Sequence, residues 1–340
     1  MAQPKTAVDI VFGAMTLGKE GAEQARVHTL EECSSILDVF QSHAHSEIDT
    51  ALVYGGGSSE QYLGQLNWQS RGLIMDTKFS PRADLGLGPD VKTIHGPEHL
   101  RLALQKSLQS LQAEKIDLWY LHAPERSTPY EVTMREVNAL HQAGYFRRFG
   151  ISNFMSWEVA QICEICERNG WIKPSVYQGV YNAVHRAVEP ELFPCLRKYG
   201  VAFYAFNPLA GGYLTGRYTR DMLEREEVVE KGSRFDPERS QGRNYRRRYW
   251  NEKYFDALDI LRPVAEKHGL TEAECALRWM TNHSLLKREF GDAIIIGASS
   301  GKQLEENLIN LEKGPLPEDV VKALDEGWAT VKGVCANYHR

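Results

Sequence analysis

The sequence lacks the features of a membrane, secreted or nucleic-acid-binding protein. No apolar run in its 340 residues is long enough to cross a bilayer, and MAQPKTAVDIVFG has neither the basic start nor the apolar core of a signal peptide. Six cysteines are too few for a disulfide framework at this length. A formal net charge of −5 gives no reason to expect nucleic acid or an acidic membrane surface as a partner. We therefore expect a cytoplasmic globular protein.

A dinucleotide-binding fingerprint is also missing. In the stretch GGGSSE, residues 55–60, Glu60 stands where G-x-G-x-x-G requires its last glycine. A carboxylate at that point would repel a pyrophosphate. We therefore interpret Gly55, Gly56 and Gly57 as a turn rather than a phosphate cradle.

No motif indicates a metal site. His95 and His99 have the spacing of metal ligands, but no third ligand is close in the sequence. Pro97 between them is typical of the first residue of a helix. We expect two surface histidines and no metal.

Short apolar runs alternate with longer amphipathic stretches along the whole chain. One such stretch, 30–43, has Leu30, Cys33, Leu37 and Phe40 on one side of a predicted helix. The predicted strands are 8–15, 47–51, 72–78, 116–122, 147–152, 175–181, 201–206 and 293–299. Strands that alternate with helices indicate right-handed crossovers and a parallel sheet. Eight such units favour a closed (β/α)8 barrel over an open sheet.

No linker divides the chain, so we predict a single domain over residues 1–340. Two segments are too long for routine connectors between barrel units. One runs from Gly211 to about Glu252, and the other is a C-terminal extension from about Pro317 to Arg340. We expect these long loops to shape the binding site.

Polar residues occur where the predicted strands end. Asp49, Lys78 and His122 end three of them, and Tyr54 follows the second. Because active sites of such barrels lie at the carboxyl ends of the strands, these four side chains should converge. Asp49 would pair with a buried Lys78, and that ammonium would lower the pKa of the Tyr54 phenol. Such a tyrosine can donate a proton to a carbonyl, but a nicotinamide must supply the hydride.

The motifs that carry these residues resemble one family. They include GAMTLG, EIDTALVY, DTK, DLWYLHAPE, YQGVYNAVHR, FYAFNPLAGGYLTGRY, IIIGASS and NYHR. Together they resemble the aldo-keto reductase superfamily over nearly the whole chain, closest to its aflatoxin-aldehyde reductase branch, which includes succinic semialdehyde reductase-like enzymes. The resemblance implies NADPH-dependent reduction of aldehydes and ketones to alcohols, with dialdehydes or carboxylated aldehydes among the substrates. It also implies that Tyr54 donates the proton, that Asp49 and Lys78 tune it, and that His122 orients the carbonyl.

The family binds NADPH without a Rossmann domain, and the resemblance implies which residues contact the cofactor here. They are Met15, Asp49, Ser152, Asn153, Gln178, Phe206, Asn207, Pro208, Leu209, Gly211, Arg217, Arg234, Ser299, Ser300, Gln303, Glu306 and Asn307. Many members use a Lys and an Arg for the 2′-phosphate, where this chain has Gly297 and Gln303. Ser299, Ser300, Lys302 or Arg234 would then supply what those cations do.

Substrate binding is implied for His122, Tyr245, Arg248 and Arg340, with the arginines holding a carboxylate. The branch contains homodimers, which predicts a homodimer. Two alternatives stay open. One is a regulatory nucleotide-binding protein like the channel β-subunits, although few residues precede the first predicted strand. The other is a biosynthetic oxidoreductase of a dedicated pathway.

Overall fold

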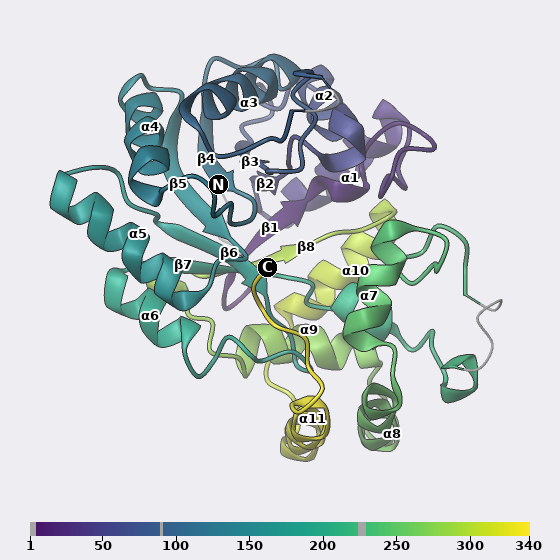
Figure 1. Ribbon diagram of the computed structural model, residues 1–340. Helices are drawn as coiled ribbons and strands as arrows, with labels where there is room; N and C mark the ends of the chain where they lie inside the picture. The colour runs from purple at the N-terminus through teal and green to yellow at the C-terminus, as the bar shows by residue number, and fades with distance from the viewer. Residues whose placement is uncertain (1–4, 89–90, 224–228) are drawn as a thin grey trace.

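Parallel strands closed into a barrel form the centre of the protein (Figure 1). The structure, a computed structural model, describes residues 5–88, 91–223 and 229–340. The strands neighbour one another in chain order, and β1 pairs with β8 to close the barrel. They are β1 (Asp9–Gly13), β2 (Glu47–Asp49), β3 (Ile74–Phe79), β4 (Ile116–Leu121), β5 (Phe146–Ser152), β6 (Val176–Val180), β7 (Ala202–Phe206) and β8 (Ala293–Ile296). The predicted (β/α)8 barrel is confirmed.

Helices surround the barrel, and each predicted strand is followed by a helix or a long loop (Figure 1). The α-helices are α1 (Leu30–Ser42), α2 (Ser58–Gln65), α3 (Pro97–Ser110), α4 (Tyr130–Gln142), α5 (Ser156–Asn169), α6 (Leu192–Tyr199), α7 (Ser240–Tyr249), α8 (Glu252–Lys267), α9 (Glu272–Asn282), α10 (Gly301–Glu312) and α11 (Glu318–Val331). Among the described residues, no helix is long and apolar enough to cross a membrane.

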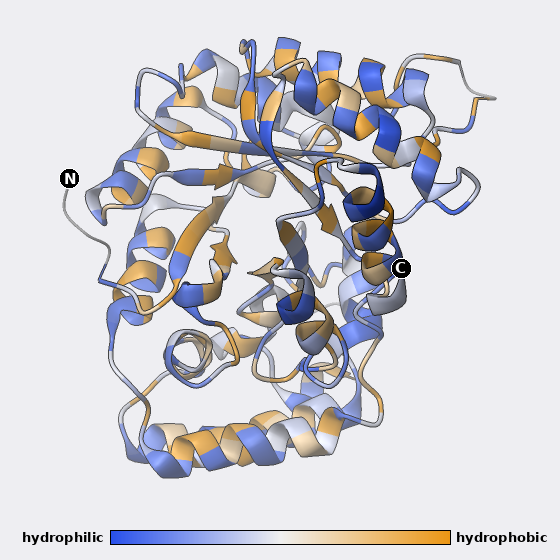
Figure 2. Cartoon of the chain, turned by 90° about the vertical axis from the view of Figure 1, so that its left-hand side faces the viewer, coloured by the Kyte–Doolittle hydropathy of each residue, from blue (hydrophilic) through white to orange (hydrophobic). Residues whose placement is uncertain are grey.

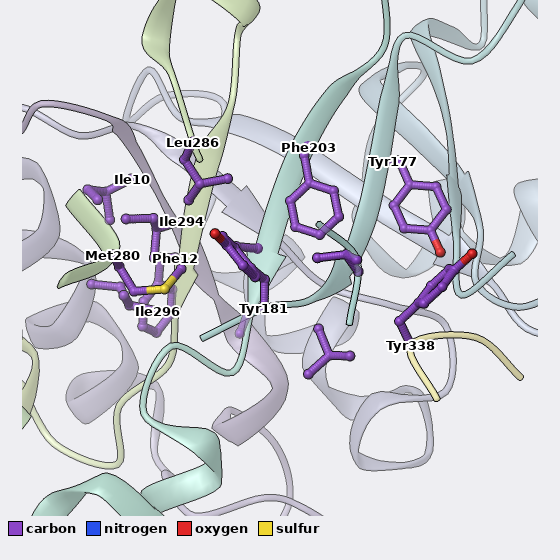
Figure 3. Packing of buried hydrophobic residues seen from close by; sticks show 14 of the residues in the cluster. Ile10, Phe12, Tyr177, Tyr181, Phe203, Met280, Leu286, Ile294, Ile296 and Tyr338 are labelled. Carbon is purple, nitrogen blue, oxygen red and sulfur yellow. The ribbon is translucent and has the colours of Figure 1, made fainter. Parts of the chain in front are cut away.

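The alternation of side chains along the strands separates two apolar clusters. Ile10, Phe12 and Ile294 face outward and join the large cluster under the helices (Figure 3). Val11 and Ile295 face inward and join a small cluster inside the barrel. Because the helices contribute only one apolar stripe each, most of them appear striped in Figure 2.

Helix α3 begins at Pro97, as predicted, with proline in the first turn. The expectation of two surface histidines is wrong for His95, which is 1% exposed and packs its ring on Phe79. Its backbone N–H donates to the Glu125 carboxylate, and the Nδ1 of His99 accepts from the N–H of Ile94. Both histidines therefore build the loop before α3.

Residues of the two long segments line the cavity at one end of the barrel. Residues 211–252, of which 224–228 lie outside the described ones, contain all but the first residue of η3 (Ala210–Thr215), together with η4 (Arg220–Leu223) and α7. In the second segment, α11 packs beside α8, and the chain then returns toward the barrel strands (Figure 1). Tyr338 of this C-terminal tail, residues 333–340, lies beside Tyr177 of β6 (Figure 3).

Charged side chains fill the amino-terminal end of the barrel interior. The Arg148 guanidinium on β5 bonds the Glu47 carboxylate at 2.5 Å and the Asp117 carboxylate at 2.7 Å. It also donates to the Tyr204 hydroxyl at 3.0 Å. Burial, and then the nearby Glu47, raise the pKa of Asp76 well above its ordinary value. One arginine thus links β2, β4, β5 and β7.

Carboxylate oxygens of Glu47, Asp76 and Asp117 lie within 4.8 Å of one another, close enough to suggest a cation site. The Arg148 guanidinium already provides the positive charge there, since it contacts two of the three acids and lies 4.0 Å from the third. This group therefore works as an ion-pair network.

Replacing Arg148 should destabilise the barrel. Arg148→Met leaves Glu47 and Asp117 without their shared counter-charge, and breaking a largely buried pair typically costs about 3 kcal/mol. Urea unfolding of the variant should show a loss of that order in the free energy of unfolding. The control is Arg147→Met, because Arg147 also pairs with Asp117 but is 68% exposed, so its loss should cost less than about 1 kcal/mol. Equal losses in the two variants would contradict the network.

Candidate active site

A cavity of about 760 Å³ opens at the carboxyl ends of the strands. Its wall combines strand ends, the loops that follow them, α7 and the C-terminal tail. The volume is that of a typical cofactor or ligand site. Three of the four predicted catalytic residues, Asp49, Tyr54 and His122, line it, and Lys78 lies directly beneath.

A glycine turn presents Tyr54 to the cavity. Gly55, Gly56 and Gly57 have φ angles of 56°, 63° and 92°, the left-handed region that only glycine enters without strain. Gly57 then caps α2. The interpretation of these glycines as a turn is confirmed. Glu60 of α2 is buried against Thr77, and burial raises its pKa to about 7.

Lys78 is fully buried and holds three oxygen atoms together. Its Nζ donates to Asp49 Oδ2 at 2.5 Å, to the Thr50 carbonyl at 2.6 Å and to the Tyr54 hydroxyl at 3.5 Å. Burial alone would lower the pKa of Lys78, but the attraction of Asp49 and Tyr54 outweighs it and raises the pKa. The amine is therefore an ammonium that joins β3 to the Tyr54 loop.

The expected pKa of Tyr54 is wrong in direction. Burial raises the pKa of the phenol above its usual value of about 10, and the Lys78 ammonium offsets only part of this effect. The nearby Asp49 carboxylate adds to the rise. Sequence reasoning considered the cation and not the desolvation, so it reversed the sign. The phenol is protonated over the whole physiological range.

His122 is a neutral imidazole. Burial lowers its pKa well below 6.5, and the positive charges of Lys78, Arg340 and Arg82 lower it further. Its ring lies edge-on to Tyr54, with 5.7 Å between the ring centroids. A neutral imidazole can still donate one hydrogen bond to an oxygen atom beside the Tyr54 hydroxyl.

Two amides at the cavity wall have polar atoms without partners among the described residues. Asn153 Nδ2 bonds the His122 carbonyl and Ser152 Oγ, which leaves its buried Oδ1 unsatisfied. Asn207 Oδ1 accepts from Tyr245, whereas its buried Nδ2 has no partner. Gln178 reaches across the barrel to donate to Asp49 Oδ1 at 2.8 Å. Buried unsatisfied amide atoms facing a cavity fit a polar ligand such as a carboxamide.

Most residues implied to contact the cofactor line the same cavity, and Ser300 and Glu306 do not. The Ser300 hydroxyl caps α10 by accepting from the N–H of Gln303, and the Glu306 side chain is 62% exposed. Lys302 is 87% exposed and also lies off the wall. The Ser300 hydroxyl is thus used within the helix, and the Glu306 and Lys302 side chains are exposed to solvent.

The Arg234 guanidinium lies beside Gly297, the position where the sequence lacks the cation expected from the family resemblance. A Cβ built on Gly297 would lie 3.6 Å from the Nη2 atom of Arg234. The Nη1 atom of Arg234 donates to the Tyr245 hydroxyl at 3.0 Å, and this bond holds the guanidinium at the cavity wall. Gly211 must be glycine, because its φ is 71° and any Cβ would overlap the Tyr245 ring.

The predicted substrate residues Tyr245, Arg248 and Arg340 all line the cavity. The tail that carries Arg340 is fastened to the barrel, since the N–H of Arg340 donates to the Asn153 carbonyl at 3.0 Å. Arg126 Nη2 donates to the main-chain oxygen of Arg340 at 2.9 Å.

Sequence reasoning missed other lining residues, among them Thr16, Arg26 and Arg82. Thr16 and Arg26 belong to the segment between β1 and α1, and Arg82 belongs to the loop between β3 and α3. Loops at the carboxyl ends of barrel strands form such walls, and that rule was the one available signal for them.

Known proteins are similar to this sequence over most of its length. The sequence model of the Aldo/keto reductase family matches residues 9–329. The chain is 49% identical over 342 residues to the aldo-keto reductase pigE of Monascus ruber, which covers 99% of this chain and 98% of that protein. It is 52% identical over 303 residues to an aldo-keto reductase of Pseudocercospora fijiensis, which covers 89% of this chain and 99% of that protein. It is 42% identical over 334 residues to aflatoxin B1 aldehyde reductase member 2 of Mus musculus, which covers 97% of this chain and 87% of that protein.

Proposed function

The chain belongs to the aldo/keto reductase family, whose activity is the reduction of carbonyl compounds to alcohols, and on this premise we propose that it is an NADPH-dependent aldehyde reductase with Tyr54 as proton donor. The observation that carries the proposal is the Lys78 ammonium, which contacts both Asp49 and the Tyr54 hydroxyl at the floor of the cavity. The phenol and the His122 ring meet at the same point of the wall.

NADPH, when bound, supplies the hydride. The residues that would hold its nicotinamide are Ser152, Asn153 and Gln178, where Asn153 has a free buried oxygen atom. Phe206 lines the cavity and offers a ring for stacking, and Asn207 has a free buried amide nitrogen. The cavity and its unsatisfied amides therefore fit a nicotinamide cofactor.

Tyr54 would give its proton to the carbonyl oxygen as the oxygen gains negative charge. The Lys78 ammonium, 3.5 Å from the hydroxyl, then stabilises the phenolate that forms. A neutral His122 would donate a hydrogen bond to the same oxygen and so fix the orientation of the carbonyl. Asp49 keeps Lys78 charged.

Removing the Tyr54 hydroxyl tests this assignment. Tyr54→Phe should fold and bind NADPH nearly as the wild type does, because the ring and the glycine turn remain. Its kcat should fall by about 10²–10⁴-fold, the usual contribution of a general acid. NADPH absorbance with a good aldehyde gives the rate, and cofactor fluorescence gives the affinity. An unchanged kcat would remove Tyr54 from the chemistry, and a wild type that binds NADPH without turnover would favour the regulatory alternative.

The pH dependence tests the raised pKa of Tyr54. Reduction requires the protonated phenol and the reverse oxidation requires phenolate. Because the pKa lies above 10, deprotonation of Tyr54 should not slow reduction between pH 7 and 9, and kcat/KM for alcohol oxidation should still rise at pH 9. A plateau of oxidation together with a fall of reduction in that interval would show instead that Lys78 dominates the phenol.

NADPH should bind more tightly than NADH, since Arg234 stands beside Gly297 at the place proposed for the 2′-phosphate. One charge-assisted hydrogen bond contributes about 1.5 kcal/mol or more, which corresponds to at least about tenfold in Kd. Fluorescence titration of Arg234→Ala should show the preference falling toward one. The control Lys302→Ala removes an exposed cation off the cavity wall and should keep the preference. Equal Kd values for both cofactors in the wild type would contradict the proposal.

The substrate class is proposed from the arginines of the rim. Arg248 and Arg340 can hold a carboxylate near the carbonyl site, so carboxylated aldehydes are proposed as substrates. The relative from Mus musculus is named as an aldehyde reductase, which agrees with an aldehyde as the reacting group. A homodimer and a cytoplasmic location stay predictions, and ultracentrifugation of the purified protein tests the first.

A further inference from the structure

Three guanidinium groups from separate segments of the cavity wall, in addition to Arg247 beside Arg248, have no counter-charge among the described residues. They are Arg82 of the loop between β3 and α3, Arg248 of α7 and Arg340 of the C-terminal tail. Within residues 5–88, 91–223 and 229–340, no carboxylate is in ion-pair distance of any of the three. At the cofactor end Arg217 and Arg26 pair with Glu230 at 3.4 and 3.2 Å, whereas Arg234 bonds the Tyr245 hydroxyl and has no carboxylate partner among the described residues.

The three charges act on one another and on the carbonyl site. Desolvation lowers the pKa of Arg340, and the like charges of Arg248 and Arg82 lower it further, although its guanidinium stays open to the cavity. Arg340 and Arg82 also lower the pKa of His122. Like charges held together at a cavity wall repel one another, and an anion between them relieves that repulsion.

Hydrogen bonds of the backbone keep Arg340 and Arg82 in place. Arg340 is fixed through its own backbone at Asn153 and Arg126, and the Tyr338 hydroxyl accepts from the N–H of Ser156 at 3.1 Å. The N–H of Arg82 donates to Ser80 Oγ at 3.2 Å, which shapes the loop that follows Lys78. The backbone positions of Arg340 and Arg82 are therefore fixed by hydrogen bonds to the barrel and its loops.

A single carboxylate cannot form bidentate hydrogen bonds with all three guanidinium groups. A carboxylate offers roughly four lone-pair sites, and two bidentate arginines occupy all of them. Arg248 and Arg340 are sufficient for the single carboxylate of the proposed function. Arg82 comes from the loop of a different strand and is left for a second acidic group.

We propose that Arg82, Arg248 and Arg340 form one anion site that selects carbonyl substrates with two carboxylates, and that Arg82 is the residue that distinguishes a dianion from a monoanion. The inference rests on the proposed function for the carbonyl chemistry, whereas the anion site itself is testable by binding alone.

The kinetic test uses three rigid aldehydes: 3-methylbenzaldehyde, 3-formylbenzoate and 5-formylisophthalate, with no, one and two carboxylates. We expect KM for the dianion to be at least fivefold lower than KM for the monoanion, with similar kcat, because the contact exists in ground and transition states alike. Arg82→Gln should raise KM for the dianion to that of the monoanion and change the other two aldehydes by less than twofold. Arg248→Gln or Arg340→Ala should raise KM for both anions.

Two controls separate this site from general attraction. Arg243→Gln removes a cation from the same helix as Arg248, but Arg243 lies off the cavity wall, so the ratio of the two KM values should stay unchanged. Arg82→Lys keeps the charge without the planar fork and should restore part of the preference. An unchanged ratio in Arg82→Gln, or no preference for the dianion in the wild type, would overturn the proposal.

Calorimetric binding of isophthalate and benzoate distinguishes failure of this site from failure of the proposed function. Tighter binding of isophthalate, lost in Arg82→Gln, would support the site even if no aldehyde were reduced. Turnover of 3-methylbenzaldehyde without any difference between the two acids would support the reductase and exclude the site.

Discussion

A fully buried ammonium organises this protein. Lys78 has no contact with water, and an isolated charge in such a place would cost several kcal/mol. The cost is offset only if Asp49 and the Thr50 carbonyl meet its Nζ atom. This requirement fixes β2 against β3 and brings the end of β2 and the Tyr54 loop over the lysine. The interaction that keeps the barrel interior intact is therefore the one that positions the phenol.

Charge is layered along the barrel axis. The Arg148 network closes the amino-terminal end, the buried Asp76 with its raised pKa lies between, and the Lys78–Asp49 pair lies under the cavity. Outside the same strands, side chains such as Phe12 and Ile294 belong to the apolar core (Figure 3). The pleat keeps the two environments apart, since neighbouring residues of a strand face opposite sides. Electrostatics can thus be concentrated inside without weakening the packing outside.

Local pattern was sufficient for the strands and for the polar residues that end them, because strands buried on both faces are short continuous apolar runs, which a few residues of sequence reveal. The same reasoning failed where the pKa or the burial of a residue depends on groups far away in the sequence. The pKa of Tyr54 depends on how much protein surrounds the phenol, and the burial of His95 depends on Phe79 of another element. Arg82 has an ordinary loop sequence, and only the three-dimensional wall shows that it stands with Arg340. Ser300 resembled a ligand-binding serine, but its place at the start of α10 gives its hydroxyl a structural task.

The pairing of β1 with β8 joins strands from opposite ends of the sequence. During synthesis on the ribosome β1 emerges first of the strands, and its partner β8 is made only after all the others. An apolar strand edge therefore stays open for most of translation, and such edges invite pairing with other chains. Closing a ring through so large a separation is also slow. Any shielding of that edge, by chaperones or by helices that have already formed, would limit such pairing until β8 is made.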